Sequence, residues 1–102
     1  METYLETSWG NQWDNVDMQI VRAATKGIKG MDDEHGAFWV GIIKEQENVL
    51  EVYKDLRLLG IFEDEPGIQY SRHARDWGEV EVLFYTLMSD QIEVLKSQLK
   101  RG

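Results

Sequence analysis

The chain has no cysteine, a single proline and no apolar run long enough to cross a membrane. Without cysteine, disulfides, thiolate chemistry and cysteine-based zinc sites are excluded, and a small oxidised secreted scaffold is excluded with them. A membrane-spanning helix needs about 20 predominantly apolar residues. The opening "METYLETSW" has neither the basic nor the apolar region of a signal peptide. We therefore expect a cytoplasmic protein with no membrane partner.

Motifs for cofactors and metals are also missing. The chain has neither a G-x-x-x-x-G-K-[ST] phosphate loop nor a G-x-G-x-x-G dinucleotide fingerprint, and "GIKGMDDEHG" is only glycine spacing in a loop. The acids beside His35 lack the alternate spacing of a calcium loop, and there is no H-E-x-x-H motif. Only a fold that brought His73 beside His35 would supply a second imidazole. We therefore expect no cofactor and no dedicated metal site.

The composition is that of a globular domain. The 102 residues are 42% hydrophobic and 29% charged, with four tryptophans, four tyrosines and three phenylalanines to fill a core. This length is typical of one domain, and no internal repeat, low-complexity tract or linker divides it. We therefore expect one globular domain over residues 1–102.

Negative charge is concentrated in the first two-thirds of the chain. The formal net charge is −8. Residues 1–35 and residues 36–67 each contain seven acids and three bases, whereas residues 68–102 contain five of each. Such a surface repels phosphate, so we expect no nucleic-acid partner. It would attract a basic protein, although acidity that only maintains solubility is the alternative interpretation.

Residues 13–30, "WDNVDMQIVRAATKGIKG", are expected to form a helix. One helical stripe contains Val16, Ile20, Ala23, Ala24 and Gly27. Asp14 or Asn15 is the expected N-cap, and lysines near the end complement the helix dipole. Part of this stretch also fits strand alternation, so a strand remains the alternative.

The central part of the chain predicts antiparallel strands. Residues 37–44, "AFWVGIIK", form a dense apolar run of β-branched and aromatic residues. Residues 49–62 fit both a helix and strands; their neighbours favour strands, and the helix remains the alternative. Pro66–Gly67 is a turn pair. Residues 68–74 alternate, and residues 79–87 are rich in strand formers, so we expect both to be strands.

An amphipathic helix is expected at the C-terminus. Asp90 and Glu93 have the spacing of a capping box. The apolar face contains Ile92, Leu95 and Leu99, and the bases Lys96, Lys100 and Arg101 lie at the negative end of the dipole. With Lys96 expected at the surface, Lys96→Ala should cost well under about 1 kcal/mol.

These elements predict an α+β fold: a single domain with an N-terminal helix, an antiparallel β-meander of three to five strands and a C-terminal amphipathic helix. In size, acidity, arrangement and lack of catalytic motifs, the chain resembles the class of small bacterial immunity proteins. That class-level resemblance implies an intracellular inhibitor that neutralises a basic partner such as a toxin.

The stretch "YSRHARDWGE", residues 70–79, is the most chemically loaded part of the sequence. In a strand, Ser71 and His73 would share one face, but Asp76 has the opposite parity and there is no G-x-S-x-G elbow. A catalytic serine needs a base that a third group orients, and donors for an oxyanion. We therefore expect no catalytic residues and no enzyme. Instead, the stretch would form the polar face of a strand, with Arg75 facing acids on its neighbour.

The interaction hypothesis places partner contacts in the acidic two-thirds of the chain, because turns leave charged side chains exposed. The candidate partner-binding acids are Asp32, Asp33, Glu63 and Asp64. Trp9 and Trp13 are further candidates because aromatics are enriched at interfaces; a core position is the other interpretation of both. We expect a basic protein as the partner, and a homodimer is an alternative.

The alternative function is a small-molecule-binding domain with an aromatic-lined pocket. Trp39 and Tyr53 would line this pocket with the two N-terminal tryptophans, and Arg72 or Arg75 would anchor a ligand anion. A homodimeric enzyme with a site shared between the chains is a third hypothesis.

Overall fold

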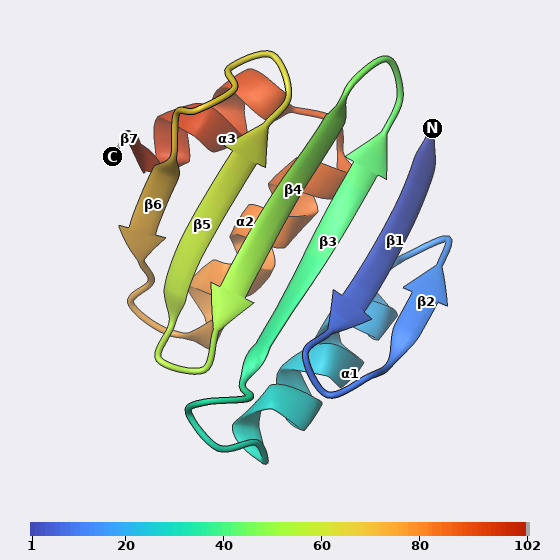
Figure 1. Cartoon of the computed structure of the whole chain (residues 1–102), viewed down its shortest axis with the longest axis vertical. Coiled ribbons are helices and arrows are strands. Elements are labelled where there is room, and N and C mark those ends of the chain that lie inside the picture. The colour runs from blue at the N-terminus through green and yellow to red at the C-terminus, as the bar shows by residue number, and fades with distance from the viewer. Residues whose placement is uncertain (102) are drawn as a thin grey trace.

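One antiparallel sheet, with three helices on a single face, makes up residues 1–101, the part of the chain that this computed structural model describes (Figure 1). The elements are β1 (Glu2–Thr7), β2 (Gln12–Asp14), α1 (Met18–Lys29), β3 (Ala37–Ile43), β4 (Glu47–Tyr53), β5 (Arg57–Phe62), β6 (Tyr70–His73), α2 (Trp77–Met88), α3 (Ile92–Gln98) and β7 (Lys100–Arg101). The strand order is β2-β1-β3-β4-β5-β6-β7.

The predicted α+β class is confirmed, but the sheet is larger than predicted. Within residues 1–101 it has seven strands, where three to five were expected. The difference comes mainly from the β1–β2 hairpin, which precedes the first helix. Strand β1 also pairs with β3 along the whole length of β1. The chain therefore begins with strands, and α1 is its third element.

Helix α1 starts later than predicted and buries a different stripe. Its N-cap is Asp17, whose carboxylate accepts a hydrogen bond from the Ile20 N–H at 3.0 Å; Asp14 ends β2 instead. The buried residues are Val21, Ala24, Thr25 and Ile28. Ala23, expected on the buried side, is exposed. The helix begins at Met18, and Val21 is its first side chain buried against the sheet. The other buried side chains follow at spacings of three and four residues, which keeps them on the same face of the helix.

The strand interpretation of residues 49–62 is confirmed, since β4 and β5 form a hairpin. Its turn includes Leu56, which has a positive φ of 73°. The predicted Pro66–Gly67 turn is present as well. Gly67 has φ of 84°, and the Ile68 N–H donates to the Glu65 carbonyl at 3.2 Å, as in a type II turn.

The prediction of a strand at residues 79–87 is wrong, because this stretch belongs to α2. The Asp76 side chain caps the helix by accepting a hydrogen bond from the Glu79 N–H at 2.8 Å. The side chains that α2 buries at helical spacing are Val80, Leu83, Phe84 and Leu87. Burying them against the sheet outweighs the strand preference of its valine, phenylalanine and tyrosine residues, because tertiary packing overrides local propensity.

The predicted C-terminal helix is confirmed as α3, with two corrections. Asp90 is not its cap: it adopts a left-handed φ of 59°, and its carboxylate pairs with Lys44 at 3.3 Å. Lys96, expected at the surface, has a side chain that is only 9% exposed and is surrounded by carboxylates. The predicted dipole partners Lys100 and Arg101 have side chains outside the described part of the structure.

The core lies between the helices and one face of the sheet. Its centre is the stacked pair Phe38 and Phe84, whose ring centroids are 5.3 Å apart. Buried apolar side chains of the strands surround this pair, including Leu5, Val40, Ile42, Leu50, Val52, Leu58 and Phe62. All of these point to the helix side, so the alternate residues of the same strands line the opposite face. No helix within residues 1–101 covers that face (Figure 1).

Candidate functional site

The face of the sheet opposite the helices, here called the open face, carries aligned rows of side chains. Strand register places one row across five strands, formed by Glu6, Trp39, Glu51, Leu59 and Ser71. The neighbouring row contains Tyr4, Gly41, Val49 and Ile61. The larger side chains of both rows are partly exposed, and Ile61 is 49% exposed. This is an apolar and acidic surface that contributes nothing to the core.

Trp39 is held in place at the centre of the first row. Its indole Nε1–H donates to Glu6 Oε1 at 3.1 Å, and Glu51 is its neighbour on the other side. Trp39 is partly exposed. A large aromatic fixed by a hydrogen bond loses little conformational freedom when it is covered, which suits it to anchor a partner.

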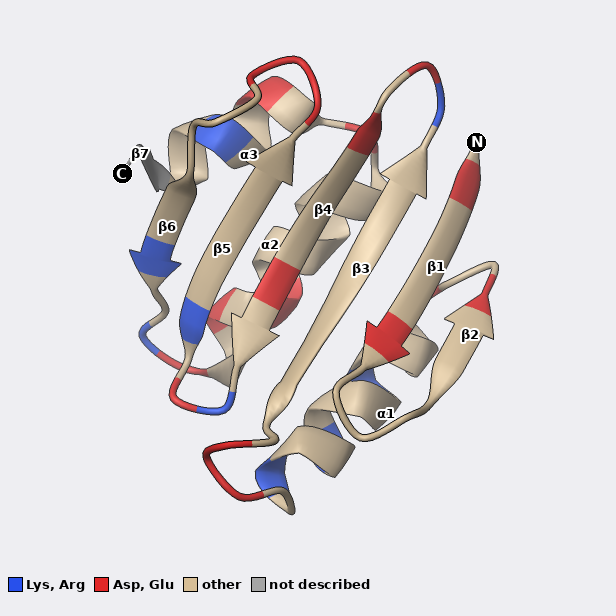
Figure 2. Ribbon diagram, in the orientation of Figure 1, with Lys and Arg blue, Asp and Glu red and all other residues tan. Residues whose placement is uncertain are grey.

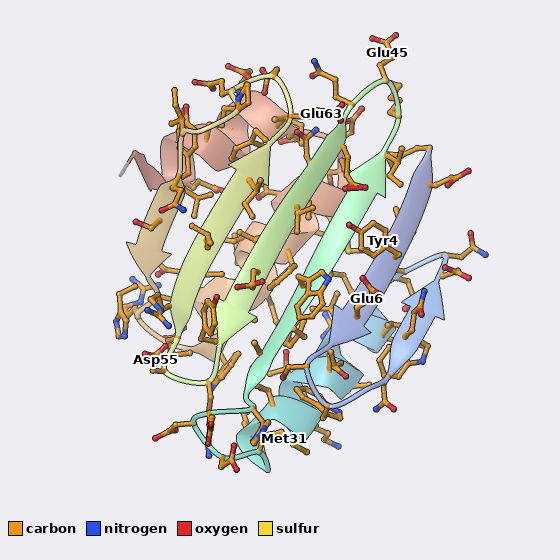
Figure 3. All side chains as sticks on the ribbon, viewed as in Figure 1. Tyr4, Glu6, Met31, Glu45, Asp55 and Glu63 are labelled. Atoms are coloured by element: carbon orange, nitrogen blue, oxygen red, sulfur yellow. The ribbon has the colours of Figure 1, made fainter. Side chains whose placement is uncertain are left out.

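Tyr4 lies flat across the neighbouring strand because residue 41 is glycine. A Cβ atom built on Gly41 would overlap the Tyr4 ring. Figure 3 shows Tyr4 and Glu6 on the viewer's side of the sheet, over β1 and β3. The missing side chain of Gly41 therefore makes the space in which the ring packs.

We expect Gly41→Ala to destabilise the protein by about 1–3 kcal/mol, because the new methyl group must displace the Tyr4 ring. Urea unfolding measures the loss. In a double-mutant cycle, Tyr4→Ala should remove most of the penalty. An equal penalty with and without the ring would show that Gly41 serves the backbone instead.

The open face has a negative electrostatic field. Its carboxylates belong to Glu2, Glu6, Asp14, Glu47 and Glu51. Burial, together with the charges of Glu47 and Glu6, raises the pKa of Tyr4. A hydrogen bond to Glu51 raises the pKa of Tyr53, and burial raises it further to a smaller extent. In Figure 2 acidic residues mark β1 and β4, whereas basic ones lie toward β5 and β6.

Arg57 is the one lysine or arginine whose described side chain lies on the open face. It is engaged within the chain, because its guanidinium lies 4.3 Å from the centroid of the Tyr53 ring. The face therefore combines carboxylates with partly exposed aromatic and aliphatic groups, and the one cation among its described side chains is at one corner.

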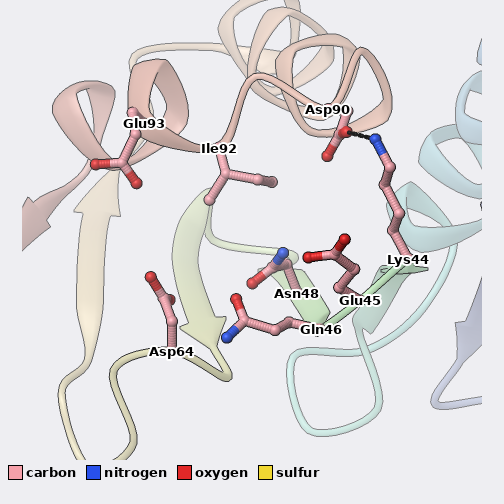
Figure 4. Close-up of a pocket in the computed structure, with 8 residues that line it drawn as sticks. All are labelled: Lys44, Glu45, Gln46, Asn48, Asp64, Asp90, Ile92 and Glu93. Carbon is pink, nitrogen blue, oxygen red and sulfur yellow. Dashed lines mark hydrogen bonds and ion pairs between the residues drawn. The ribbon is translucent and has the colours of Figure 1, made fainter.

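A second candidate is a pocket at one end of the sheet, on the helix side (Figure 4). It is about 300 Å³ in volume. Its walls come from the β3–β4 turn with the start of β4, from the loop after β5, and from the α2–α3 connection with the start of α3. Its lining residues are Lys44, Glu45, Gln46, Asn48, Asp64, Asp90, Ile92 and Glu93. Carboxylates predominate here as well.

The four turn acids predicted to bind a partner lie at opposite ends of the sheet (Figure 2). At one end, Asp32 accepts hydrogen bonds at 2.8 Å from the backbone N–H and from Nδ1 of His35. The backbone bond and then the ring contact lower the pKa of Asp32. Asp33, the next residue, is exposed. At the other end, the Glu63 carboxylate accepts a hydrogen bond from the Glu47 N–H, and Asp64 forms an ion pair with Lys96 of α3.

Trp9 and Trp13 lie on the helix side and pack against the core cluster. Trp13 is the register partner of the fully buried Leu5. The Trp9 ring sits against Gly27 of α1, where a Cβ would come within 2.9 Å of it. Neither tryptophan is part of the open face.

Residues predicted for a ligand pocket are divided between the two faces. Trp39 and Tyr53 share the open face. Arg72 lies on the helix side, where its guanidinium pairs with Glu79 at 2.9 Å and donates to the Gln98 carbonyl at 2.8 Å. Arg75, in the loop before α2, is exposed.

The loaded stretch at residues 70–79 serves local structure. Ser71 and His73 do share the open face. Asp76, the third member that a triad would need, caps α2. Within the described residues no group of three or more histidine and acidic side chains could hold a metal ion. None of the described helices is long and apolar enough to span a membrane.

Comparison with known proteins adds no relative. No family model, no curated protein and no solved structure matches the chain. The function is therefore inferred from the geometry of the two candidate sites.

Tyr4, Glu6 and Glu51 were not among the site residues predicted from the sequence. A signal for the first two was present, since the apolar and polar residues of "ETYLET" alternate. For Glu51 the signal was that it lies two residues before Tyr53, so both would share one face of a strand. That stretch, however, also fitted a helix. Neither signal shows which face of the sheet the helices leave uncovered.

Proposed function

We propose that the protein is an inhibitor-type interaction protein that binds a basic protein through the open face of its sheet. The observation that carries this proposal is the row in which Trp39 lies between Glu6 and Glu51 on a face that no described helix covers. It places a fixed aromatic anchor beside carboxylates at the centre of a broad surface.

Two physical effects support this proposal. Partly exposed aromatic and aliphatic side chains provide area whose burial stabilises a complex, at about 25 cal/mol per Å². The surrounding carboxylates attract a positively charged partner over about 8–10 Å at moderate salt, and so increase the association rate. A basic protein with an apolar centre to its binding surface complements both features.

The polar residues around Ser71 and His73 also favour binding over catalysis. Asp76 and Glu79 are engaged at the start of α2 and with Arg72, so they are not arranged around the Ser71–His73 pair. The proposal is therefore for a non-enzymatic protein. An immunity function, in which a toxin is the basic partner, is its most specific form.

The test is affinity capture from the native host, followed by titration of the purified partner. The face variant is Glu6→Gln/Glu51→Gln, which keeps the side-chain shape and the acceptor for Trp39. Its matched control is Asp33→Asn/Glu34→Gln, which removes the same charge from an exposed loop. We expect the face variant to weaken binding by about tenfold or more, and the control to weaken it much less.

Two further observations are required of a true partner. Its association rate should fall as ionic strength rises, and Trp39→Ala should increase its dissociation rate. A physiological partner whose binding ignores salt and the face variant, or is lost equally in the control, would contradict the proposal.

A further inference from the structure

The pocket at the end of the sheet has an excess of negative charge. Of its lining side chains, Glu45, Asp64, Asp90 and Glu93 carry carboxylates, and Lys44 is the one cation. Lys96, which does not line the pocket, also pairs with Asp64 at 3.0 Å and with Glu93 at 3.5 Å, so four carboxylates face two cations. Lys44 is paired with Asp90 at 3.3 Å, as the dashed line in Figure 4 shows. Glu45 forms no ion pair or hydrogen bond with any described residue.

Asn48 supplies a second, independent feature of this pocket. It occupies a helix-side position of β4, between Ile42 of β3 and Phe62 of β5, and it is only 7% exposed. Its Oδ1 has no hydrogen-bond partner among the described residues. A buried amide oxygen left unpaired costs about 1–3 kcal/mol. A leucine or valine would fill this position in an apolar row at lower cost.

The position of the amide suggests what compensates for that cost. The Asn48 side chain forms part of the pocket wall, surrounded by Glu45, Asp64 and Ile92 (Figure 4). The site thus offers an amide acceptor and carboxylates to a ligand that carries several donors and positive charge.

We infer that this pocket binds a guanidinium group. A guanidinium has five N–H donors in one plane, and it is less strongly hydrated than an ammonium ion. Its donors can reach acceptors on separate segments, namely Glu45 on the β3–β4 turn, Asp64 on the loop after β5 and the Asn48 amide. Ile92 provides an apolar surface for the aliphatic stem of an arginine. This inference does not depend on the proposed function, since the pocket and the open face use different side chains.

The ligand has two sources with the same chemistry: an arginine side chain of a protein, or a free arginine-like molecule. Titrations followed by backbone amide NMR shifts separate them. The probes are ethylguanidinium, free L-arginine and the blocked tripeptide acetyl-Gly-Arg-Gly-amide, and ethylammonium is the matched cation. We expect saturable, millimolar binding of guanidinium probes, with shifts confined to residues 44–48, 63–65 and 90–93. Stronger binding of the tripeptide identifies a protein ligand, and stronger binding of free arginine identifies a small molecule.

Two variants test the residues. Glu45→Gln should weaken the binding of ethylguanidinium about tenfold, whereas Glu34→Gln, at the other end of the sheet, should leave it unchanged. Asn48→Leu should abolish binding and raise the melting temperature, because an unpaired polar group is replaced by an apolar one. A purely structural Asn48 would give the opposite result, a lower melting temperature with binding retained.

Three outcomes overturn the inference. The first is the absence of saturable shifts with every guanidinium probe. The second is equal binding of ethylammonium, which would indicate attraction to charge without recognition of the planar group. The third is saturable binding whose shifts lie outside the three segments of the pocket.

Discussion

Replacing Phe84 by alanine should destabilise the protein by about 3–5 kcal/mol, the loss typical of a fully buried phenylalanine. Phe84 has no exposed surface and stacks on Phe38 of β3, so the substitution opens a cavity between α2 and the sheet. Domains of this size are stable by about 5–15 kcal/mol. The loss should therefore be a large fraction of the total in urea or thermal unfolding.

The neighbouring residue is the matched control. Tyr85, also aromatic and on the same helix, is 62% exposed. Tyr85→Ala should change the free energy of unfolding by no more than about 0.5 kcal/mol. A strand at residues 79–87 would place Phe84 and Tyr85 on opposite faces as well, so a third variant is needed. Leu87, also buried, has the parity of Tyr85 in a strand; a small effect of Leu87→Ala would contradict the helix.

Lys96→Met should cost about 2–4 kcal/mol, although its position in the sequence suggested a surface lysine. Its Nζ lies 2.7 Å from Glu65 Oε1, 3.0 Å from Asp64 Oδ2 and 3.5 Å from Glu93 Oε2. Methionine keeps the apolar stem but leaves these carboxylates to repel one another. Breaking a fully buried pair costs about 3–5 kcal/mol, and the partial exposure of Asp64 and Glu65 reduces this value.

Lys44→Met provides the control, since the ion pair between Lys44 and Asp90 is exposed and should contribute less than about 1 kcal/mol. Equal, small losses in both variants, measured by urea unfolding, would show that the environment of Lys96 does not stabilise the fold.

The contribution of Lys96 should also depend on pH. Burial alone would lower the pKa of Lys96, but hydrogen bonds to Glu65 and Asp64 and the charges of Asp64 and Glu93 raise it above the ordinary value of 10.5. A group whose pKa is raised in the folded state stabilises that state fully below its unfolded pKa, and the effect is lost as pH rises through the folded pKa. The difference between wild type and Lys96→Met should therefore stay constant from neutral pH to about pH 10 and shrink in more alkaline solution.

Local sequence determined several elements of this protein correctly. The apolar run of β3, the Pro66–Gly67 turn and the amphipathic pattern of α3 are each decided by residues close together in the chain, so a short window contains their cause. The capping signal of α2 was equally local, since Asp76 and Glu79 have capping-box spacing. In the prediction from sequence, the strand formers of residues 79–87 outweighed this capping signal, although the same residues also fit a buried helix.

Only the tertiary structure decided the environment of Lys96 and the composition of the candidate sites. Asp64 and Glu65 precede Lys96 by about 30 positions, and no pattern around α3 shows that the loop after β5 folds against it. The row through Glu6, Trp39 and Glu51 likewise joins three strands, and β2 and α1 lie between β1 and β3 in the chain, so no single turn sets its register. Alternation within each strand determines which residues share a face. The helices determine which face becomes the core, because they can cover only one, and that choice depends on contacts between segments distant in the sequence.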